Sequence, residues 1–389
     1  MRILILAPQP FFEVRGTPLN VLAVIRSLTE LGHQVELLSF PQGTNVDVAG
    51  LVHHRSLPLP VGHVKAGPSL AKILLDIPFL VEAVLRIAFS RPDAVHAVEE
   101  AAHLVSPFAR LLRVPLVVDV DSSIPDQLRY TGFATRGPLL WLADILENHA
   151  LRHAVAAITV CQSLSDGVRR RAPGTPVFQV EDPPLVDPGR PLDPEPGRAL
   201  RAQLGLGDAP VVLYTGNFES YQGVELLVDA AALCPGITFL FMGGETADIQ
   251  RMESRAHDPA RCVFAGKRPP AELPQFLAAA DVVASPRSRG ENTPFKLYTY
   301  LASGRPLVAT RIPTHTQLLD DTLALLVAPS AEGLASGIRE VISAPDSARL
   351  RAESGRALVE RNFGPDRFRE KLGRAYEEVA RRTRSVDSA

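Results

Sequence analysis

Short apolar runs alternate with amphipathic stretches along most of the chain. The apolar runs occupy residues 2–7, 34–40, 94–98, 116–120, 156–160, 210–216, 237–242, 263–265, 282–285, 307–310 and 324–327. Short apolar runs without alternation are typical of strands that are buried on both faces of a parallel sheet. Helical patterns lie between them, at residues 17–31, 101–112, 139–154 and from residue 223, and a charged helix is expected at 366–382. The pattern predicts an α/β fold with doubly wound, Rossmann-like sheets.

A proline-rich passage divides the chain. Residues 181–197 read EDPPLVDPGRPLDPEPG, with six prolines in seventeen positions, which favours a linker over a continuing helix or strand. We therefore expect an N-terminal domain at 1–185, a linker at 186–200, a C-terminal domain at 201–364 and a last helix at 365–389. Two such domains would face each other across a ligand-binding cleft.

The amino-acid composition limits the classes of ligand and the cellular location that can be expected for this protein. The 41 basic residues nearly balance the 43 acidic ones, so the net charge of −2 does not indicate nucleic-acid binding. Cys161, Cys234 and Cys262 are too few and too far apart for a disulfide framework or a zinc site. The first apolar run is cut by Pro8 and reads as a strand, not a signal peptide. These features favour a cytoplasmic location.

Residues 73–89 form the most apolar helical stretch. Asp76, Pro78, Glu82 and Arg86 interrupt it, so no apolar span of membrane-crossing length exists there. We expect a partly buried helix. Docking on the inner face of a membrane remains open as the alternative.

The stretch 285–311, SPRSRGENTPFKLYTYLASGRPLVATR, suggests a loop, a helix and a strand in succession. Thr293 is expected as the N-cap and Pro294 as the first helical residue, with the helix ending at Gly304. Lys296 then falls in the first turn, where a cation opposes the helix dipole unless it faces an anionic ligand. A solvated surface lysine is the alternative.

A similar helix start is expected at Thr17-Pro18, after a loop that ends in Arg15 and Gly16.

Several common sequence motifs of binding and catalytic sites are absent from the sequence. It contains no phosphate-binding G-x-x-x-x-G-K-[ST], no dinucleotide fingerprint after the first strand, no G-x-S-x-G and no H-E-x-x-H.

Six segments carry a resemblance to the retaining glycosyltransferases of family 4. They are RGTPLNVLAVIRSLTELGHQVELLSF (15–40), RPDAVHAVEEAA (91–102), YTGNFESYQGVELLVDAA (214–231), FLFMGGE (239–245), FAGKRPPAELPQFLAAADVVASP (264–286) and GENTPFKLYTYLASGRPLVAT (290–310). The resemblance implies the two-domain GT-B fold. It also implies a donor, UDP- or GDP-linked, in the second domain and a hydroxyl acceptor in the first, with no cofactor and no obligatory metal.

The resemblance also implies site residues, and this chain departs from the family at several of them. The family carries two glutamates separated by seven residues; the first matches Glu291, expected near the sugar, but the second position is Thr299. The glutamate that would bind the ribose is thus replaced by a hydroxyl with one hydrogen to donate.

The family's diphosphate-binding arginine and lysine are also missing. Asn217, after Gly216, and Gln222, before Gly223, stand in their places. Lys267, Arg268 and Lys296 are the cations that could replace them. Thr293, Pro294 and Phe295 complete the expected donor-binding set.

In the first domain the family often places a histidine where this chain has Asp121, with Asp119 two residues earlier. Asp121 could orient an acceptor hydroxyl or take its proton, or it could be a loop-starting cap without chemistry. His96 and His103 are expected to be satisfied structural groups. Arg15, Gly16 and Thr17 are expected on the acceptor side.

The sequence thus predicts a transferase that moves a hexose-type sugar to a saccharide, lipid or small-molecule hydroxyl. A non-catalytic GT-B subunit and a nucleotide-sugar epimerase remain as alternatives. The nucleotide, the sugar, the acceptor and the oligomeric state stay open.

Overall fold

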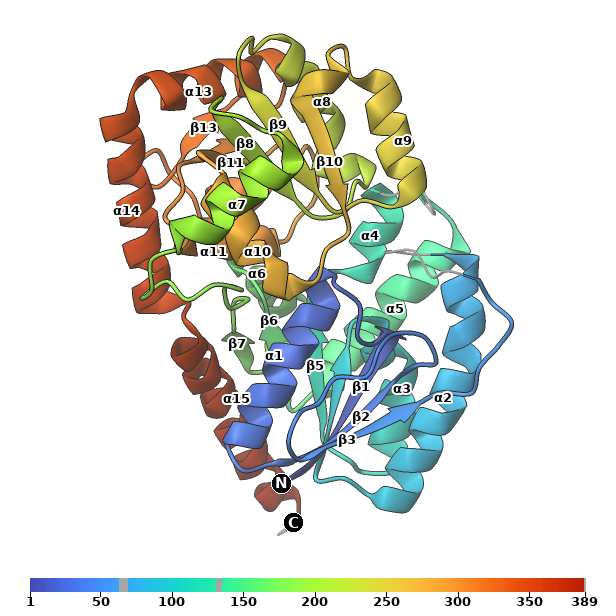
Figure 1. Cartoon of the computed structure of the whole chain (residues 1–389). Helices are drawn as coiled ribbons and strands as arrows, with labels where there is room; N and C mark the ends of the chain where they lie inside the picture. Colours follow the sequence, from blue (N-terminus) through green and yellow to red (C-terminus); the bar gives the residue numbers. More distant parts are fainter. Residues whose placement is uncertain (63–68, 131–134, 388–389) are drawn as a thin grey trace. The chain divides into compact units, whose positions relative to one another are not determined.

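A computed structural model describes residues 1–62, 69–130 and 135–387 of the chain (Figure 1). It divides into two compact units, Met1–Glu181 with Asp366–Ala389, and Asp182–Pro365. Each unit is built around one parallel sheet, so the predicted α/β class with two doubly wound domains is confirmed.

The first unit holds seven described strands in the order β3-β2-β1-β4-β5-β6-β7. The strands are β1 (Arg2–Pro10), β2 (Gln34–Phe40), β3 (Leu51–Arg55), β4 (Ala94–Val98), β5 (Leu116–Val120), β6 (Ala156–Thr159) and β7 (Val177–Gln179). The helices are α1 (Gly16–Glu30), α2 (Leu70–Ser90), α3 (Glu100–Leu111), α4 (Ile124–Tyr130), α5 (Pro138–His153), α6 (Gln162–Arg171) and α15 (Pro365–Asp387).

Two hydrophobic cores lie on the two faces of this sheet. On one face α2, α3, α5 and α6 bury their apolar residues against the strands. On the other face α1 packs together with α15, which comes from the end of the chain and contributes Phe368, Leu372 and Val379.

The second unit holds six described strands in the order β10-β9-β8-β11-β12-β13. They are β8 (Val211–Thr215), β9 (Thr238–Met242), β10 (Cys262–Gly266), β11 (Val282–Ser285), β12 (Leu307–Thr310) and β13 (Leu325–Val327). The helices are α7 (Pro194–Leu204), α8 (Val224–Ala232), α9 (Thr246–Arg255), α10 (Leu273–Ala279), α11 (Phe295–Ala302), α12 (Pro313–Thr316), α13 (Ala331–Ser343) and α14 (Pro345–Asn362), with short 3₁₀ turns η1 (Ser220–Gln222), η2 (Pro259–Arg261) and η3 (Pro270–Glu272).

Three local predictions differ from the structure. The first strand continues to Pro10, and α7 begins at Pro194, inside the passage expected to be a linker, because proline is well tolerated in the first turn of a helix. Neither Thr17 nor Thr293 is an N-cap. Helix α1 begins at Gly16 after Arg15, and α11 begins at Phe295 after Pro294, whose ψ of 127° is not helical.

Candidate active site

Glycines line the carboxyl edge of the second sheet. Gly216 follows β8, Gly243 follows β9 and Gly266 ends β10, and all three have positive φ angles. Their backbones lie close together, since the Gly216 amide donates to Met242 and the Gly243 amide donates to the Gly266 carbonyl. A Cβ on Gly243 would lie 2.0 Å from the Gly216 carbonyl oxygen. Only glycine fits there, which leaves exposed backbone along this edge.

Lys296 reaches from the first turn of α11 to this glycine edge. Its Nζ donates to Gln222 Oε1 at 3.1 Å and lies 3.9 Å from the centre of the Tyr214 ring. A Cβ on Gly216 would lie 2.9 Å from the same Nζ. The structure therefore brings together Gly216, Gln222 and Lys296, three residues predicted from the sequence to bind the donor.

The environment of Lys296 disfavours its charge. Burial and the nearby Arg287 guanidinium lower the pKa of Lys296 well below its usual value. Within the described parts of the chain, no carboxylate forms an ion pair with this ammonium. The alternative of a solvated surface lysine does not hold, because the side chain is half-buried under Tyr214 and the loop that holds Gln222. A cation held without a carboxylate partner at a helix start favours an anionic ligand.

Arg287, which the sequence analysis did not single out, is a buried cation of the same region. Its guanidinium donates to the Arg289 carbonyl and to Asn292 Oδ1, both at 2.8 Å, and lies 5.2 Å from the centre of the Tyr221 ring. The side chain thereby fixes the loop between β11 and α11. The same loop carries Glu291.

His315, which the sequence analysis missed, lies beneath this loop. Its Nδ1 donates to the Thr310 carbonyl at 2.7 Å, so the neutral ring accepts at Nε2 from Ser285 Oγ at 2.9 Å. Burial lowers the pKa of His315 to about 4, opposed by the bond to Thr310 and assisted by Arg287 and Lys296. The imidazole ties the end of β11 to the end of β12.

This buried histidine predicts a pH dependence of stability. The folded pKa lies below the unfolded one, so the unfolded state binds the extra proton between about pH 6.5 and 4. Between pH 6.5 and 4, the unfolding free energy of the wild type should fall by about 2–3 kcal/mol more than that of a His315→Asn variant. Denaturant titrations at pH 7 and 4.5 measure this difference, and parallel losses in both proteins would contradict it.

Four further residues that were predicted to bind the donor are buried or half-buried. Thr293 and Pro294 are buried, Phe295 is half-buried, and Thr299 is buried with its Oγ1 accepting from the Leu185 amide at 3.0 Å. The hydroxyl expected to contact the ribose therefore already has a backbone partner. It can still donate one hydrogen bond.

Other predicted residues are more exposed. Glu291 is exposed, and its carbonyl accepts from Gln317 at 3.0 Å. Asn217 is exposed at the end of β8, with its carbonyl accepting from Tyr214 at 2.6 Å. Lys267 and Arg268 follow β10, two strands from β8, and Lys267 pairs with Glu245 at 2.5 Å.

In the first unit, Arg15 is the N-cap residue of α1, Gly16 and Thr17 form its first turn, and Arg15 pairs with Glu13 at 2.8 Å. Asp121 is buried directly after β5. The loop before α1 and Asp121 both lie at carboxyl ends of strands, the edge where ligands bind in such sheets.

His96 is a satisfied structural group, as expected. Its two ring nitrogens lie 2.9 Å from Asp119 Oδ2 and 2.9 Å from Tyr376 Oη. The group is completely buried and connects the centre of the sheet to α15. His103 is also buried, and burial and the Arg171 charge lower its pKa to about 4.

A charged cluster that sequence reasoning missed lies where β4 ends. Glu99 has a positive φ of 50° and accepts from Ser122 Oγ at 3.2 Å, and burial raises its pKa. Lys72 of α2 pairs with Glu100 at 2.5 Å, while burial and Glu100 raise the pKa of Asp76 to about 8. Lys72 and Asp76 of α2 therefore face Glu100 of α3 instead of the solvent.

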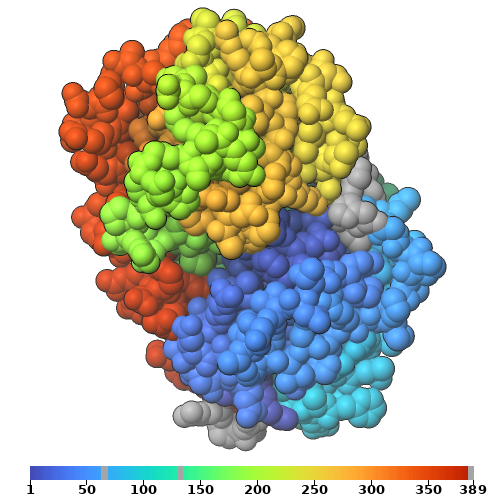
Figure 2. Space-filling view, viewed as in Figure 1, coloured from blue at the N-terminus to red at the C-terminus, as the bar shows by residue number. Residues whose placement is uncertain are grey.

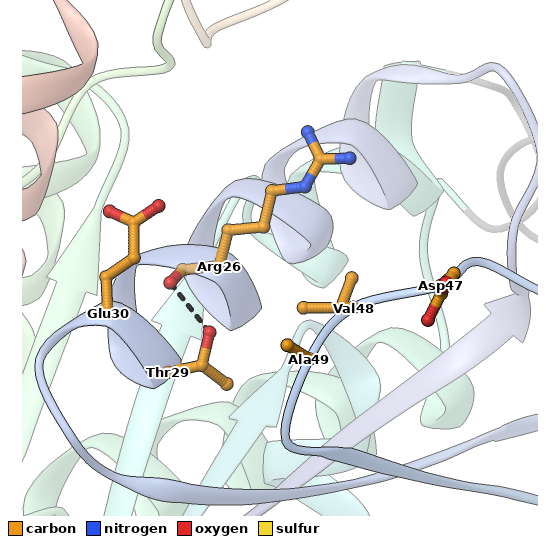
Figure 3. A pocket seen from close by; sticks show the side chains of 6 residues that line it. All are labelled: Arg26, Thr29, Glu30, Asp47, Val48 and Ala49. Atoms are coloured by element: carbon orange, nitrogen blue, oxygen red, sulfur yellow. Dashed lines mark hydrogen bonds between the residues drawn. The ribbon is translucent and has the colours of Figure 1, made fainter.

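A shallow hollow of about 280 Å³ lies elsewhere in the first unit (Figure 3). Arg26, Thr29 and Glu30 at the end of α1 line it together with residues 47–49. Because α1 runs back from the carboxyl edge of the sheet, this hollow lies at the opposite edge from the loop before α1 and Asp121. Among the described residues, no group of three or more His, Cys, Asp or Glu side chains could hold a metal ion.

Comparisons with known proteins agree with this arrangement. The family model described as "Glycosyl transferase 4-like domain" matches residues 15–183, and the one described as "Glycosyl transferases group 1" matches residues 209–344. The chain is 26% identical over 284 residues to the alpha-D-kanosaminyltransferase of Streptomyces kanamyceticus, covering 70% of this chain and 72% of that protein.

Solved structures show the same fold. The sucrose-phosphate synthase of Thermosynechococcus elongatus has a TM-score of 0.80 at 19% identity, covering 97% of this chain and 99% of that one. Anabaena HepE in complex with UDP and glucose has a TM-score of 0.77 at 19% identity, with the same coverage.

The fold and the two matched halves together define an enzyme of the glycosyltransferase class. More particularly, the chain belongs to the GT-B glycosyltransferases, with a glycosyl transferase 4-like domain followed by a glycosyl transferases group 1 domain.

Proposed function

We propose that this enzyme transfers a hexose-type sugar from a nucleotide diphosphate sugar, with retention of the anomeric configuration, to a hydroxyl of a saccharide, lipid or small molecule. The observation that carries the proposal is Lys296, a half-buried cation at the glycine edge that has no carboxylate ion pair among the described residues. A diphosphate is the anion that such a site suits.

The proposed catalysis follows from the charge that develops as the bond between the sugar and the diphosphate breaks. The bond between the sugar and the diphosphate lengthens, and negative charge accumulates on the leaving phosphate oxygens. Lys296, the free amides at the start of α11 and the backbone of the glycine edge would stabilise that charge. Gln222 would hold the lysine in place through its hydrogen bond.

The acceptor side rests on Asp121 of the first unit. Its buried carboxyl, at the carboxyl end of β5, would orient the acceptor hydroxyl. In a retaining reaction the leaving diphosphate stays on the face where the hydroxyl enters, so its own oxygen can take the hydroxyl proton.

UDP is the nucleotide to test first, because a fold neighbour was solved with UDP and glucose. The experiment is calorimetric titration with UDP, GDP and ADP, followed by incubation of the sugar nucleotide of the binding class with saccharide and lipid acceptors. Nuclear magnetic resonance of the new linkage reads its anomeric configuration. A product of inverted configuration, or an isomerised sugar nucleotide without transfer, would contradict the proposal.

Replacement of Glu291 by glutamine should lower turnover about 100-fold and change nucleotide affinity less than threefold, since its carboxylate is proposed to act at the sugar. Steady-state kinetics and UDP titration separate the two effects. Glu253→Gln, an exposed glutamate of α9, is the matched control. Equal rates in both variants would show that Glu291 has no role in the reaction.

A further inference from the structure

Helix α2 presents an apolar surface to the solvent. Seven of its side chains are exposed, and every one is a large hydrophobic: Leu70, Ile73, Leu74, Ile77, Val81, Leu85 and Phe89. The exposed fraction reaches 60% at Ile77 and 84% at Phe89. The helix forms part of the surface of its unit, in light blue and cyan in Figure 2.

The opposite side of α2 is apolar as well. Leu75, Phe79, Ala83 and Ile87 are completely buried against the sheet. The charged residues lie toward the flanks, where Lys72 pairs with Glu100 and Arg86 pairs with Glu82. A helix that is hydrophobic on both sides normally has a covering on both sides, yet the described residues cover only the inner side of α2.

The neighbouring helices extend this surface. Helix α3 packs against both α2 and α5 on the same face of the sheet (Figure 1). Its exposed side adds Phe108 and Leu111, and α5 adds Leu139, Trp141, Leu142 and Ile145. We call these thirteen exposed side chains of α2, α3 and α5 the apolar face. Large apolar side chains exposed on three neighbouring helices indicate an interaction site.

The charges around the apolar face have one sign. In the described residues between Ser69 and Ala154, six arginines are exposed: Arg91, Arg110, Arg113, Arg129, Arg136 and Arg152. No aspartate or glutamate of the same stretch is exposed, because each is buried or half-buried. Every fully exposed charge of this stretch is therefore positive.

We propose that the apolar face docks this enzyme on the surface of a bilayer containing anionic phospholipid. Leucine, isoleucine, phenylalanine and tryptophan side chains enter the boundary between headgroups and acyl chains, while arginines at the border pair with lipid phosphates. No described helix is long and apolar enough to cross a membrane, so the contact is interfacial. A second copy is the poorer occupant, because a symmetric dimer would oppose two arginine-rich borders.

Flotation of the purified full chain with vesicles tests the proposal. We expect binding to vesicles of phosphatidylcholine and phosphatidylglycerol at 7:3, at least tenfold weaker binding to phosphatidylcholine alone, and weakening by salt. The double variant Ile77→Glu with Val81→Glu should bind the anionic vesicles at least tenfold more weakly. Leu350→Glu, an exposed leucine of α14, is the matched control and should bind as the wild type does.

UDP titration and circular dichroism of each variant verify folding independently of the lipid result. A second variant, Arg110→Ser with Arg136→Ser, should lose the preference for anionic lipid and leave the apolar face intact. Absence of vesicle binding by the wild type, or equal binding by the Ile77→Glu/Val81→Glu variant, would overturn the proposal. So would a dimer in sedimentation velocity that Ile77→Glu with Val81→Glu dissociates.

Discussion

Replacement of Lys296 by methionine should weaken UDP binding at least tenfold and lower kcat/KM for the sugar nucleotide about 100-fold. Methionine keeps much of the length of the side chain and removes only the cation. The melting temperature should stay the same or rise, because the wild-type protein folds with a lysine whose charge is disfavoured by burial and by Arg287.

The combination of lost binding and preserved stability distinguishes a ligand-binding lysine from a structural one. Calorimetry, initial rates and thermal unfolding of the same preparation provide the three measurements. If UDP binds the variant as tightly as it binds the wild type, the glycine edge is not the diphosphate site and the proposed function loses its main support.

The depressed pKa of Lys296 adds a pH signature to the same experiment. A diphosphate favours the protonated amine of Lys296, so UDP binding should be accompanied by uptake of a proton. The affinity for UDP should increase as the pH falls towards the pKa that Lys296 has in the unliganded enzyme. Calorimetry in buffers of different ionisation enthalpy counts that proton. The methionine variant should not take it up.

Gly243→Ala is expected to destabilise the second unit by about 3 kcal/mol or more and to abolish UDP binding. The φ angle of Gly243 is 119°, and the new Cβ would lie 2.0 Å from the Gly216 carbonyl oxygen. Relief of that contact would push β8 and β9 apart at the edge where Lys296 lies. Denaturant unfolding and UDP titration measure the two effects.

Gly236→Ala separates the cost of a positive φ angle from the cost of a steric clash. Gly236 also has a positive φ, 81°, but an added Cβ would have no atom within 4 Å. This variant should lose only about 1 kcal/mol and keep its nucleotide affinity. Equal losses in the two variants would mean that the close approach of the two glycine backbones is unimportant.

The central strands of both sheets were predictable because they are buried on both faces and read as apolar runs. The edge strands β3 and β7 were not predicted. Strand β3 reads LVHHR and is half-exposed, and β7 has three residues, so neither carries the apolar run of a buried strand.

The helix starts show a different limit of sequence reasoning. A proline fixes φ near −65°, which suits both a helix and an extended segment. At Pro294 the observed ψ of 127° makes it the capping residue, and nothing in the local sequence specifies that angle. Thr293 is therefore buried before the cap instead of closing the first turn.

The site itself was predictable in part. Resemblance to relatives pointed to Gly216 and Gln222, and the predicted helix start pointed to Lys296. The structure brings these three residues together. The aromatic ring beside Lys296 belongs to Tyr214, 82 residues earlier in the chain. His315 is adjacent to Ser285 only because β11 and β12 are neighbours in the sheet. Such contacts depend on strand order, which local patterns do not encode.

The buried bond between His96 and Tyr376 joins residues that are 280 positions apart. Part of one helical layer of the first unit is thus supplied by α15, which follows the whole second unit in the chain. During synthesis the first sheet emerges long before α15, with Ile5, Leu37 and their neighbours lacking part of their cover. A ribosome-bound chain must therefore keep that face from aggregating until residues 366–379 have been made.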